Sequence, residues 1–314
     1  MGTEGMHADG TNTGGTNTDG TNTDERAAKP RRLPRRPASS LSEHWTRIDG
    51  VDVFYREAPG PSGARTMMHV HGFGLSGRYL LPTAEQLVHT FHTLVPDLPG
   101  FGRSGGSPRG LAVPDLAHAA VRFLDDRGVE KATLVGNSMG CPVILEFAHH
   151  YPDRIDRAVL VSPAGGAYNR PMTRAVLQLA KDGGREPMRM VKVAVPDYLR
   201  FGVASTVIMF DALTNYPSLE RLLELTIPTL VVIGDRDPLM PDPERVRELV
   251  AETDDHVVIV RLEGAAHAIN FSEPDELAYL IERFMADRPI VQGATPAQRS
   301  YEIHRSRHLP ASGA

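Results

Sequence analysis

The chain has 314 residues, of which 41% are hydrophobic and 23% charged, and its formal net charge is −5. This composition is typical of a soluble globular enzyme, and the length allows either two ordinary domains or one large α/β domain. The acidic balance excludes a strongly basic body that would bind nucleic acid, and the single cysteine excludes an intramolecular disulfide and a cysteine-based zinc site. No apolar run approaches the roughly 20 residues that a membrane helix needs, so we expect no membrane span.

The two ends of the chain do not have the composition of folded segments. Residues 1–25 repeat a Thr-Asn-Thr pattern with almost no apolar side chains, and the residues that follow are rich in arginine. The pair Arg31-Arg32 resembles a twin-arginine export signal, but the next residues are polar rather than the apolar stretch that such a signal needs. We therefore predict a disordered tail over residues 1–40 and a loose, polar tail over residues 289–314.

Short apolar runs alternate with helix-like stretches through the middle of the chain. The runs suit strands buried on both faces of a mostly parallel sheet, and they cover residues 66–70, 92–96, 132–136, 158–162, 229–234 and 256–262. The helix-like stretches cover residues 114–128, 141–152, 243–252 and 274–287. Upstream, residues 45–57 alternate on either side of Asp49-Gly50, which predicts a β-hairpin. Alternating strands and helices imply a doubly wound α/β fold.

One segment interrupts this alternation. Residues 164–225 are richer in Met, Pro and Arg than their surroundings, and they carry helix-like patches at residues 173–180 and 197–210. We interpret this segment as a helical lid inserted between two strands of the core. The core then consists of residues 41–163 and 226–288.

The strongest motif is GNSMG at residues 136–140, which follows a predicted strand and opens a predicted helix. This is the context of a G-x-S-x-G nucleophile elbow, in which the glycines allow a turn tight enough to expose the serine. The N-terminus of the following helix favours the negative charge that develops there. We predict that Ser138 is a nucleophile, whereas Cys141, just inside the helix, suits core packing.

A serine hydroxyl needs a base, and that base needs a carboxylate to orient it. His267 lies in a predicted loop between the last strand and the last helix. In the chain order that follows an elbow, the acid lies between the serine and the histidine. Asp235 and Asp237 both follow a buried strand, at the sheet edge where doubly wound folds bind ligands. We favour Asp237, because the loop has turned further outward there, and keep Asp235 as the alternative.

The HGFG loop at residues 71–74 follows another predicted strand. Its backbone N–H groups could form half of an oxyanion hole, with the N–H of Met139 as the other half. His71 would then brace the loop, with Arg103 as its partner. His69 and His71 alternate on the strand, but no third ligand motif accompanies them, so we expect no metal. Neither a dinucleotide-binding fingerprint nor a P-loop is present, and we expect no cofactor.

These motifs occur in the order HGFG, DLPGFGRS, GNSMG, GDRDPLMP and GAAHAINFSEP, and together they resemble the α/β-hydrolase superfamily over about residues 51–284. The resemblance implies an eight-stranded, mostly parallel sheet with a lid after the sixth strand. It also implies a Ser138–Asp237–His267 triad and an oxyanion hole formed by the N–H groups of Phe73 and Met139. The serine at the elbow argues against haloalkane dehalogenases and epoxide hydrolases, which have an aspartate there.

The GNSMG motif is also similar to the elbow of bacterial carbon–carbon bond hydrolases that act on ring-cleavage products. Those enzymes usually have a tryptophan just after the catalytic histidine, where this chain has Ala268-Ile269-Asn270, and its one tryptophan is Trp45. We predict a cytoplasmic serine hydrolase that cleaves an ester or lactone of a small apolar molecule through an acyl-enzyme. The alternatives are a carbon–carbon bond hydrolase, or a lyase, cofactor-free oxygenase or ligand receptor on the same fold.

Overall fold

The computed structural model describes residues 40–106, 111–164, 167–240, 248, 256–290 and 301–305. All of these belong to the second of two compact units, Ala38–Ala314. The tail predicted over residues 1–40 therefore lies outside the described residues, apart from Ser40. The helix predicted over residues 243–252 also lies outside them, apart from Glu248.

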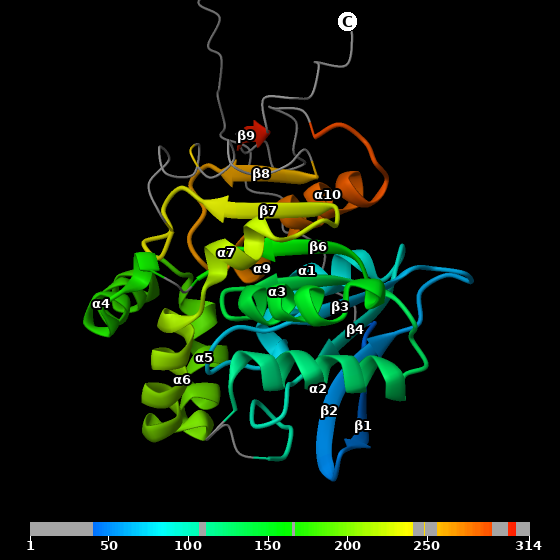
Figure 1. Cartoon of the computed structure of the whole chain (residues 1–314), viewed down its shortest axis with the longest axis horizontal. Coiled ribbons are helices and arrows are strands. Elements are labelled where there is room, and N and C mark those ends of the chain that lie inside the picture. Colours follow the sequence, from blue (N-terminus) through cyan, green and yellow to red (C-terminus); the bar gives the residue numbers. More distant parts are fainter. Residues whose placement is uncertain are drawn as a thin grey trace, which may run out of the picture. The chain divides into compact units, whose positions relative to one another are not determined.

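Nine strands of the described residues form a sheet at the centre of this unit, in the order β1-β2-β4-β3-β5-β6-β7-β8-β9 (Figure 1). In chain order the strands are β1 (Ser42–Ile48), β2 (Val51–Ala58), β3 (Thr66–Val70), β4 (His92–Pro96), β5 (Ala132–Asn137), β6 (Ile155–Val161), β7 (Thr229–Gly234), β8 (Val257–Leu262) and β9 (Tyr301–Arg305). The strands from β3 to β8 pair in parallel, whereas β1, β2 and β9 pair in antiparallel fashion towards the two edges. This topology confirms the predicted α/β fold.

Burial on both faces explains why the apolar runs form the central strands. Every position of β5 and β7 is buried, as expected for strands covered by helices on either side. One face packs against α2 (Val113–Asp126) and α3 (Gly140–His150), which lie in front of the sheet in Figure 1. The other face packs against α1 (Leu81–Leu87) and α10 (Pro274–Met285). The sheet is therefore doubly wound.

The hairpin predicted around Asp49-Gly50 is confirmed. β1 pairs with β2 with Ile48 opposite Val51, so that Asp49 and Gly50 alone form the turn. Both turn residues have positive φ, 48° for the aspartate and 80° for the glycine. A type I′ turn requires this conformation, and its twist matches that of the strands it joins.

The C-terminal segment differs from its prediction over five residues. Residues 289–314 are predicted to be loose, yet Tyr301–Arg305 form β9, which pairs with β8 and adds a ninth strand to the expected eight. The reason is the alternation of Tyr301 and Ile303, which places both side chains against the core beside α10. Tyr301 is only 1% exposed. A run this short and polar on alternate positions carries too weak a signal to predict a strand.

The chain between β6 and β7 contains the helices α4 (Met172–Gly183), α5 (Met188–Phe201), α6 (Val203–Asn215) and α7 (Ser218–Leu223). Figure 1 shows α4, α5 and α6 beside the end of the sheet to which the arrowheads of β7 and β8 point. Buried Asp197 accepts hydrogen bonds from the backbone N–H and the hydroxyl of Ser76, at 3.0 and 2.6 Å. Arg189 donates to the carbonyl of Phe271 at 3.1 Å. The segment is thus fastened to the core, and its role as a lid stays a prediction.

A helix that spans a membrane must be both long and apolar. No single helix among the described residues meets both conditions. Residues of α5 and α6 reach the required length and composition only when taken together, and a bend of 100° separates the two helices.

Candidate active site

Ser138 lies in the turn between β5 and α3, with a positive φ of 56°. Residues other than glycine rarely adopt this left-handed conformation, and those that do concentrate at functional sites. A Cβ atom on Gly136 would lie 2.7 Å from the carbonyl of Gly140, and one on Gly140 would collide with the carbonyl of Val70. The two glycines therefore let strand, turn and helix approach closely enough to place Ser138 at the carboxyl end of β5.

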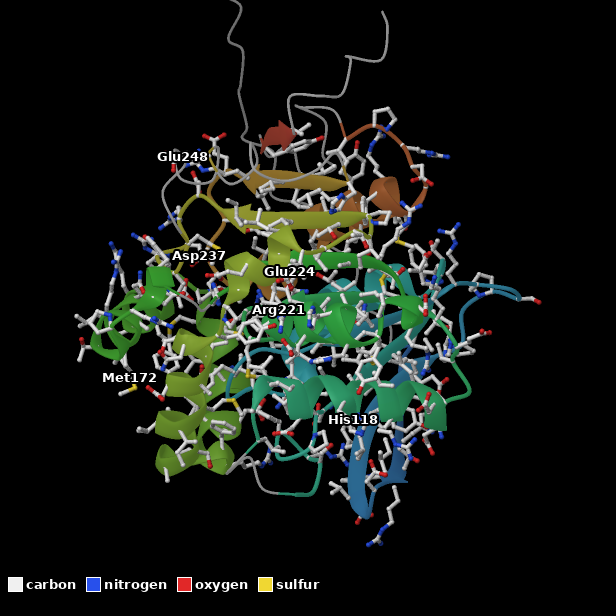
Figure 2. The ribbon with its side chains drawn as sticks, in the orientation of Figure 1. His118, Met172, Arg221, Glu224, Asp237 and Glu248 are labelled. Atoms are coloured by element: carbon white, nitrogen blue, oxygen red, sulfur yellow. The ribbon has the colours of Figure 1, made fainter. Side chains whose placement is uncertain are left out.

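His267 pairs with Asp237 through a hydrogen bond of 2.7 Å between Nδ1 and Oδ2. The Asp237 side chain is fully buried, and its other oxygen accepts the backbone N–H of Leu239 at 2.8 Å. Figure 2 shows Asp237 beyond the end of β7, on the side where α4 lies. Asp235 is exposed and instead accepts the N–H of Gly264 at 2.7 Å. Of the two aspartates, Asp237 is thus the one that contacts the histidine.

The charges around His267 favour its protonated form. Burial lowers the pKa of His267, but the charge and hydrogen bond of Asp237, together with the charges of Asp182 and Glu186, raise it to about 9. An imidazolium formed during proton transfer is therefore stabilised. Asp182 and Glu186 are absent from the sequence prediction, because KDGGRE has the composition of an ordinary polar helix end.

Ser138 and His267 line one cavity of about 290 Å³. Its walls come from the HGFG loop, the elbow, the histidine loop and the helices α4, α5 and α6. Among the described residues, no hydrogen bond joins Ser138 Oγ to the His267 ring. Catalytic hydrogen bonds of this kind are often long without substrate and shorten when it binds.

A buried hydrogen-bond network ties the three loops around the cavity together. The N–H of Gly72 donates to the Tyr79 hydroxyl at 2.7 Å, and this hydroxyl donates to Asn137 Oδ1 at 2.8 Å. The Asn137 amide donates in turn to the carbonyls of Val161 and His267, both at 3.1 Å. The sequence prediction includes neither Tyr79 nor Asn137 in a site role. Asn137 is the second residue of the elbow motif, which is the one signal that could have found it.

The HGFG loop and the elbow lie in contact, as a shared oxyanion hole requires. A Cβ atom on Gly72 would lie 3.2 Å from the Ser138 Cβ. Phe73 lines the cavity, whereas Met139 is wholly buried and does not. Among the described residues, neither the Phe73 N–H nor the Met139 N–H has a hydrogen-bond partner. The oxyanion hole formed by these two N–H groups stays a prediction.

The brace of the HGFG loop differs from the predicted one. His71 Nε2 accepts the backbone N–H of Leu98 at 2.9 Å, and Nδ1 lies 3.0 Å from the carbonyl of Gly72. Burial lowers the pKa of His71, so the ring is neutral and can accept as well as donate. The Arg103 guanidinium instead pairs with Glu43 at the surface, at 2.7 Å. The same guanidinium lies over the ring of Phe54, 3.8 Å from its centroid, so it is not the partner of His71.

The other reactive side chains near the elbow belong to the core. Cys141 is fully buried with its Sγ against the carbonyls of Gly136 and Val161, and burial raises the pKa of its thiol. His69 is also fully buried, which lowers its pKa to about 3. Among the described residues, no group of three or more His, Cys, Asp or Glu side chains could hold a metal ion.

Comparison with known proteins assigns the chain to a family. The sequence profile of the alpha/beta hydrolase family matches residues 67–278, which is more than half of the chain. The chain belongs to the alpha/beta-hydrolase family. The resemblance inferred from the motifs is therefore confirmed.

Individual relatives show over how much of the chain the sequence similarity extends. The pimeloyl-[acyl-carrier protein] methyl ester esterase of Photorhabdus laumondii is 26% identical over 270 residues, covering 77% of this chain and 99% of that one. The dihydrolipoyllysine-residue acetyltransferase component of the acetoin cleaving system of Cupriavidus necator is 32% identical over 179 residues. That match covers 56% of this chain and only 46% of that relative.

A solved structure of a membrane phospholipase A, a bacterial virulence factor, is similar with a TM-score of 0.68. The two chains are 23% identical, and the match covers 79% of this chain and 87% of the phospholipase. At this level of identity the likeness shows the shared alpha/beta-hydrolase fold.

Proposed function

We propose that the protein is a serine hydrolase that cleaves an ester or lactone of a small apolar substrate. One observation carries the proposal: Ser138 and His267 line the same apolar cavity, and His267 is hydrogen-bonded to the buried carboxylate of Asp237. A serine at a strained turn, a histidine base and a buried carboxylate together form the arrangement that activates a serine hydroxyl. The methyl ester esterase among the relatives agrees with this reaction type.

The proposed mechanism assigns each group a role. Asp237 holds His267 in the tautomer with a proton on Nδ1, which leaves Nε2 free to take the Ser138 proton. The serine oxygen attacks the carbonyl carbon, and the N–H groups of Phe73 and Met139 stabilise the resulting oxyanion. His267 then protonates the departing alcohol, which leaves an acyl-enzyme. A water molecule deprotonated by His267 releases the acid and restores Ser138.

The polarity of the cavity favours an uncharged substrate. Aliphatic and aromatic side chains such as Met190 and Phe210 make up most of its wall. Asp182 and Glu186 supply carboxyl groups there and His267 an imidazole, and no lysine or arginine is among the described lining residues. A ring-cleavage product carries a carboxylate, which would be costly to bury beside two acidic side chains. This favours the ester substrate over the carbon–carbon bond hydrolase alternative.

We expect kcat/KM for p-nitrophenyl esters to rise from acetyl to butyryl or hexanoyl and then to fall. Each buried CH₂ contributes about 0.8 kcal/mol, or roughly a fourfold gain at most. The decline follows once the acyl chain fills the cavity of about 290 Å³. Steady-state kinetics across the ester series, on one enzyme batch, measure this profile.

A matched pair of variants tests whether the cavity sets the optimum. Ala194 lines the cavity, so Ala194→Leu should shorten the best acyl chain. Ala204 is exposed on α6 and does not line it, so Ala204→Leu should leave the profile unchanged. Slow, flat ester rates beside rapid bleaching of a coloured 2-hydroxy-6-oxo-dienoate would establish the carbon–carbon bond hydrolase instead. Inactivity on both would favour the lyase, oxygenase or receptor alternatives.

A further inference from the structure

Two carboxylates of the helical segment contact the loop that carries His267. Asp182, near the end of α4, accepts a hydrogen bond from the backbone N–H of His267 at 3.2 Å. Glu186, in the turn that follows, accepts one from the N–H of Ala268 at 2.7 Å. The turn fixes their spacing, because the N–H of Glu186 donates to the carbonyl of Asp182 at 3.1 Å. The helical segment is thus fastened directly to the histidine loop.

Asp182 is buried within the site, and Glu186 is half-buried there. Asp182 is 4% exposed, and both side chains line the cavity with Ser138 and His267. Burial raises the pKa of Asp182, and it raises the pKa of Glu186 to about 7. The second oxygen of Glu186 is buried, with no hydrogen-bond partner among the described residues. Burial also raises the pKa of the neighbouring Tyr198 phenol, which therefore stays uncharged.

The charges that face His267 come from two parts of the fold. Asp237 approaches from the loop after β7, and Asp182 and Glu186 approach from the end of α4 and the turn beyond it. The positive charge of Arg185 lowers the pKa of Asp182 to some extent, but its guanidinium donates a hydrogen bond to the carbonyl of Arg236 in the loop after β7. The balance around the imidazole is therefore negative, and two of its three carboxylates belong to the helical segment.

We propose that Asp182 and Glu186 are positioning residues. They seat His267 through its loop, and their negative charge stabilises the imidazolium that forms when His267 takes the Ser138 proton. The helical segment then completes the active site in addition to covering the substrate. This proposal rests on the serine-hydrolase function proposed above.

Amide variants separate the charge from the hydrogen bond. In Asp182→Asn and Glu186→Gln an oxygen still accepts the backbone N–H, but the negative charge is gone. A carboxylate within about 4–6 Å raises the pKa of a histidine, so its loss lets His267 act as a neutral base at lower pH. We expect the acid limb of the kcat/KM profile to move down by about one pH unit. Its plateau should fall by a few-fold at most, because the imidazolium is less stabilised and His267 becomes a somewhat weaker base.

Alanine variants remove the hydrogen bond as well. In Asp182→Ala and Glu186→Ala we expect the plateau kcat to fall by about tenfold or more, because displacement of a reacting group by about 1 Å costs up to about 10²-fold. KM should change little, and the amide variants should restore most of kcat, because they keep the hydrogen bond. Asp211→Asn and Glu220→Gln are matched controls, since both carboxylates are exposed on the same helical segment. Neither control should shift the profile.

An NMR titration of the His267 ring supplies a readout that needs no turnover. The wild-type pKa is expected at about 9, and the amide variants should lower it by about one pH unit. If neither readout shifts while the wild type cleaves esters, the positioning proposal is overturned and the proposed function stands. If the NMR titration shifts but the wild type cleaves no ester, the proposed function alone fails.

Discussion

Asp237→Asn is expected to lower kcat by about 10⁴-fold, the size of the effect known for the corresponding change in serine proteases. The variant loses the carboxylate that stabilises the imidazolium, and an asparagine amide can hold His267 in the wrong tautomer. Since Asp237 Oδ2 lies 2.7 Å from His267 Nδ1 and is fully buried, water cannot replace it. Steady-state kinetics on the best ester measure the loss.

Asp235→Asn is the control for this experiment. Asp235 accepts the N–H of Gly264 through one oxygen, a contact that an asparagine oxygen can keep. The control should therefore retain most of the activity. A larger loss in Asp235→Asn than in Asp237→Asn would reassign the acid to Asp235.

Gly140→Ala is expected to destabilise the protein by about 3 kcal/mol, at the upper end of the cost of overpacking a core. The new Cβ would collide with the Val70 carbonyl, and a backbone atom of the central sheet has no room to move away. Urea unfolding measures the change in the free energy of unfolding.

Gly183→Ala makes the same substitution where there is space. Gly183 lies in α4, and a Cβ there would meet no atom within 4 Å. Alanine favours a helix over glycine by up to about 1 kcal/mol, so this variant should be as stable as the wild type or slightly more so. Equal stability of the two variants would show that the elbow does not depend on close approach at Gly140.

Most of the core could be predicted from the sequence, because the signals there are local. Central strands such as β5 and β7 are continuous apolar runs, and Asp49-Gly50 supplies the two residues that a type I′ turn needs. The elbow motif is preceded by a predicted strand and followed by a predicted helix. Local sequence patterns therefore single out Ser138 and His267 and narrow the acid to Asp235 or Asp237.

The remaining features depend on contacts between distant segments. From the sequence alone, Asp182 and Glu186 have the pattern of surface residues. Their hydrogen-bond partners in the loop that carries His267 lie 85 and 82 residues further along the chain. Tyr79 donates to Asn137 in the elbow, 58 residues further along the chain, and no motif around Tyr79 predicts this contact. The predicted His71–Arg103 brace was wrong because Leu98 already supplies the partner of the imidazole. Tertiary packing decides these contacts, and no local pattern contains them.

The central claim is that Ser138 is the nucleophile, and reaction with a fluorophosphonate probe tests it most directly. Active enzyme would be treated with the probe, assayed for residual ester hydrolysis and digested for mass spectrometry, with Ser138→Ala as the control. We expect a single label on Ser138, loss of activity in proportion to labelling, and no label on the control. Enzyme that stays active and unlabelled, or that carries its label on another residue, would contradict the claim.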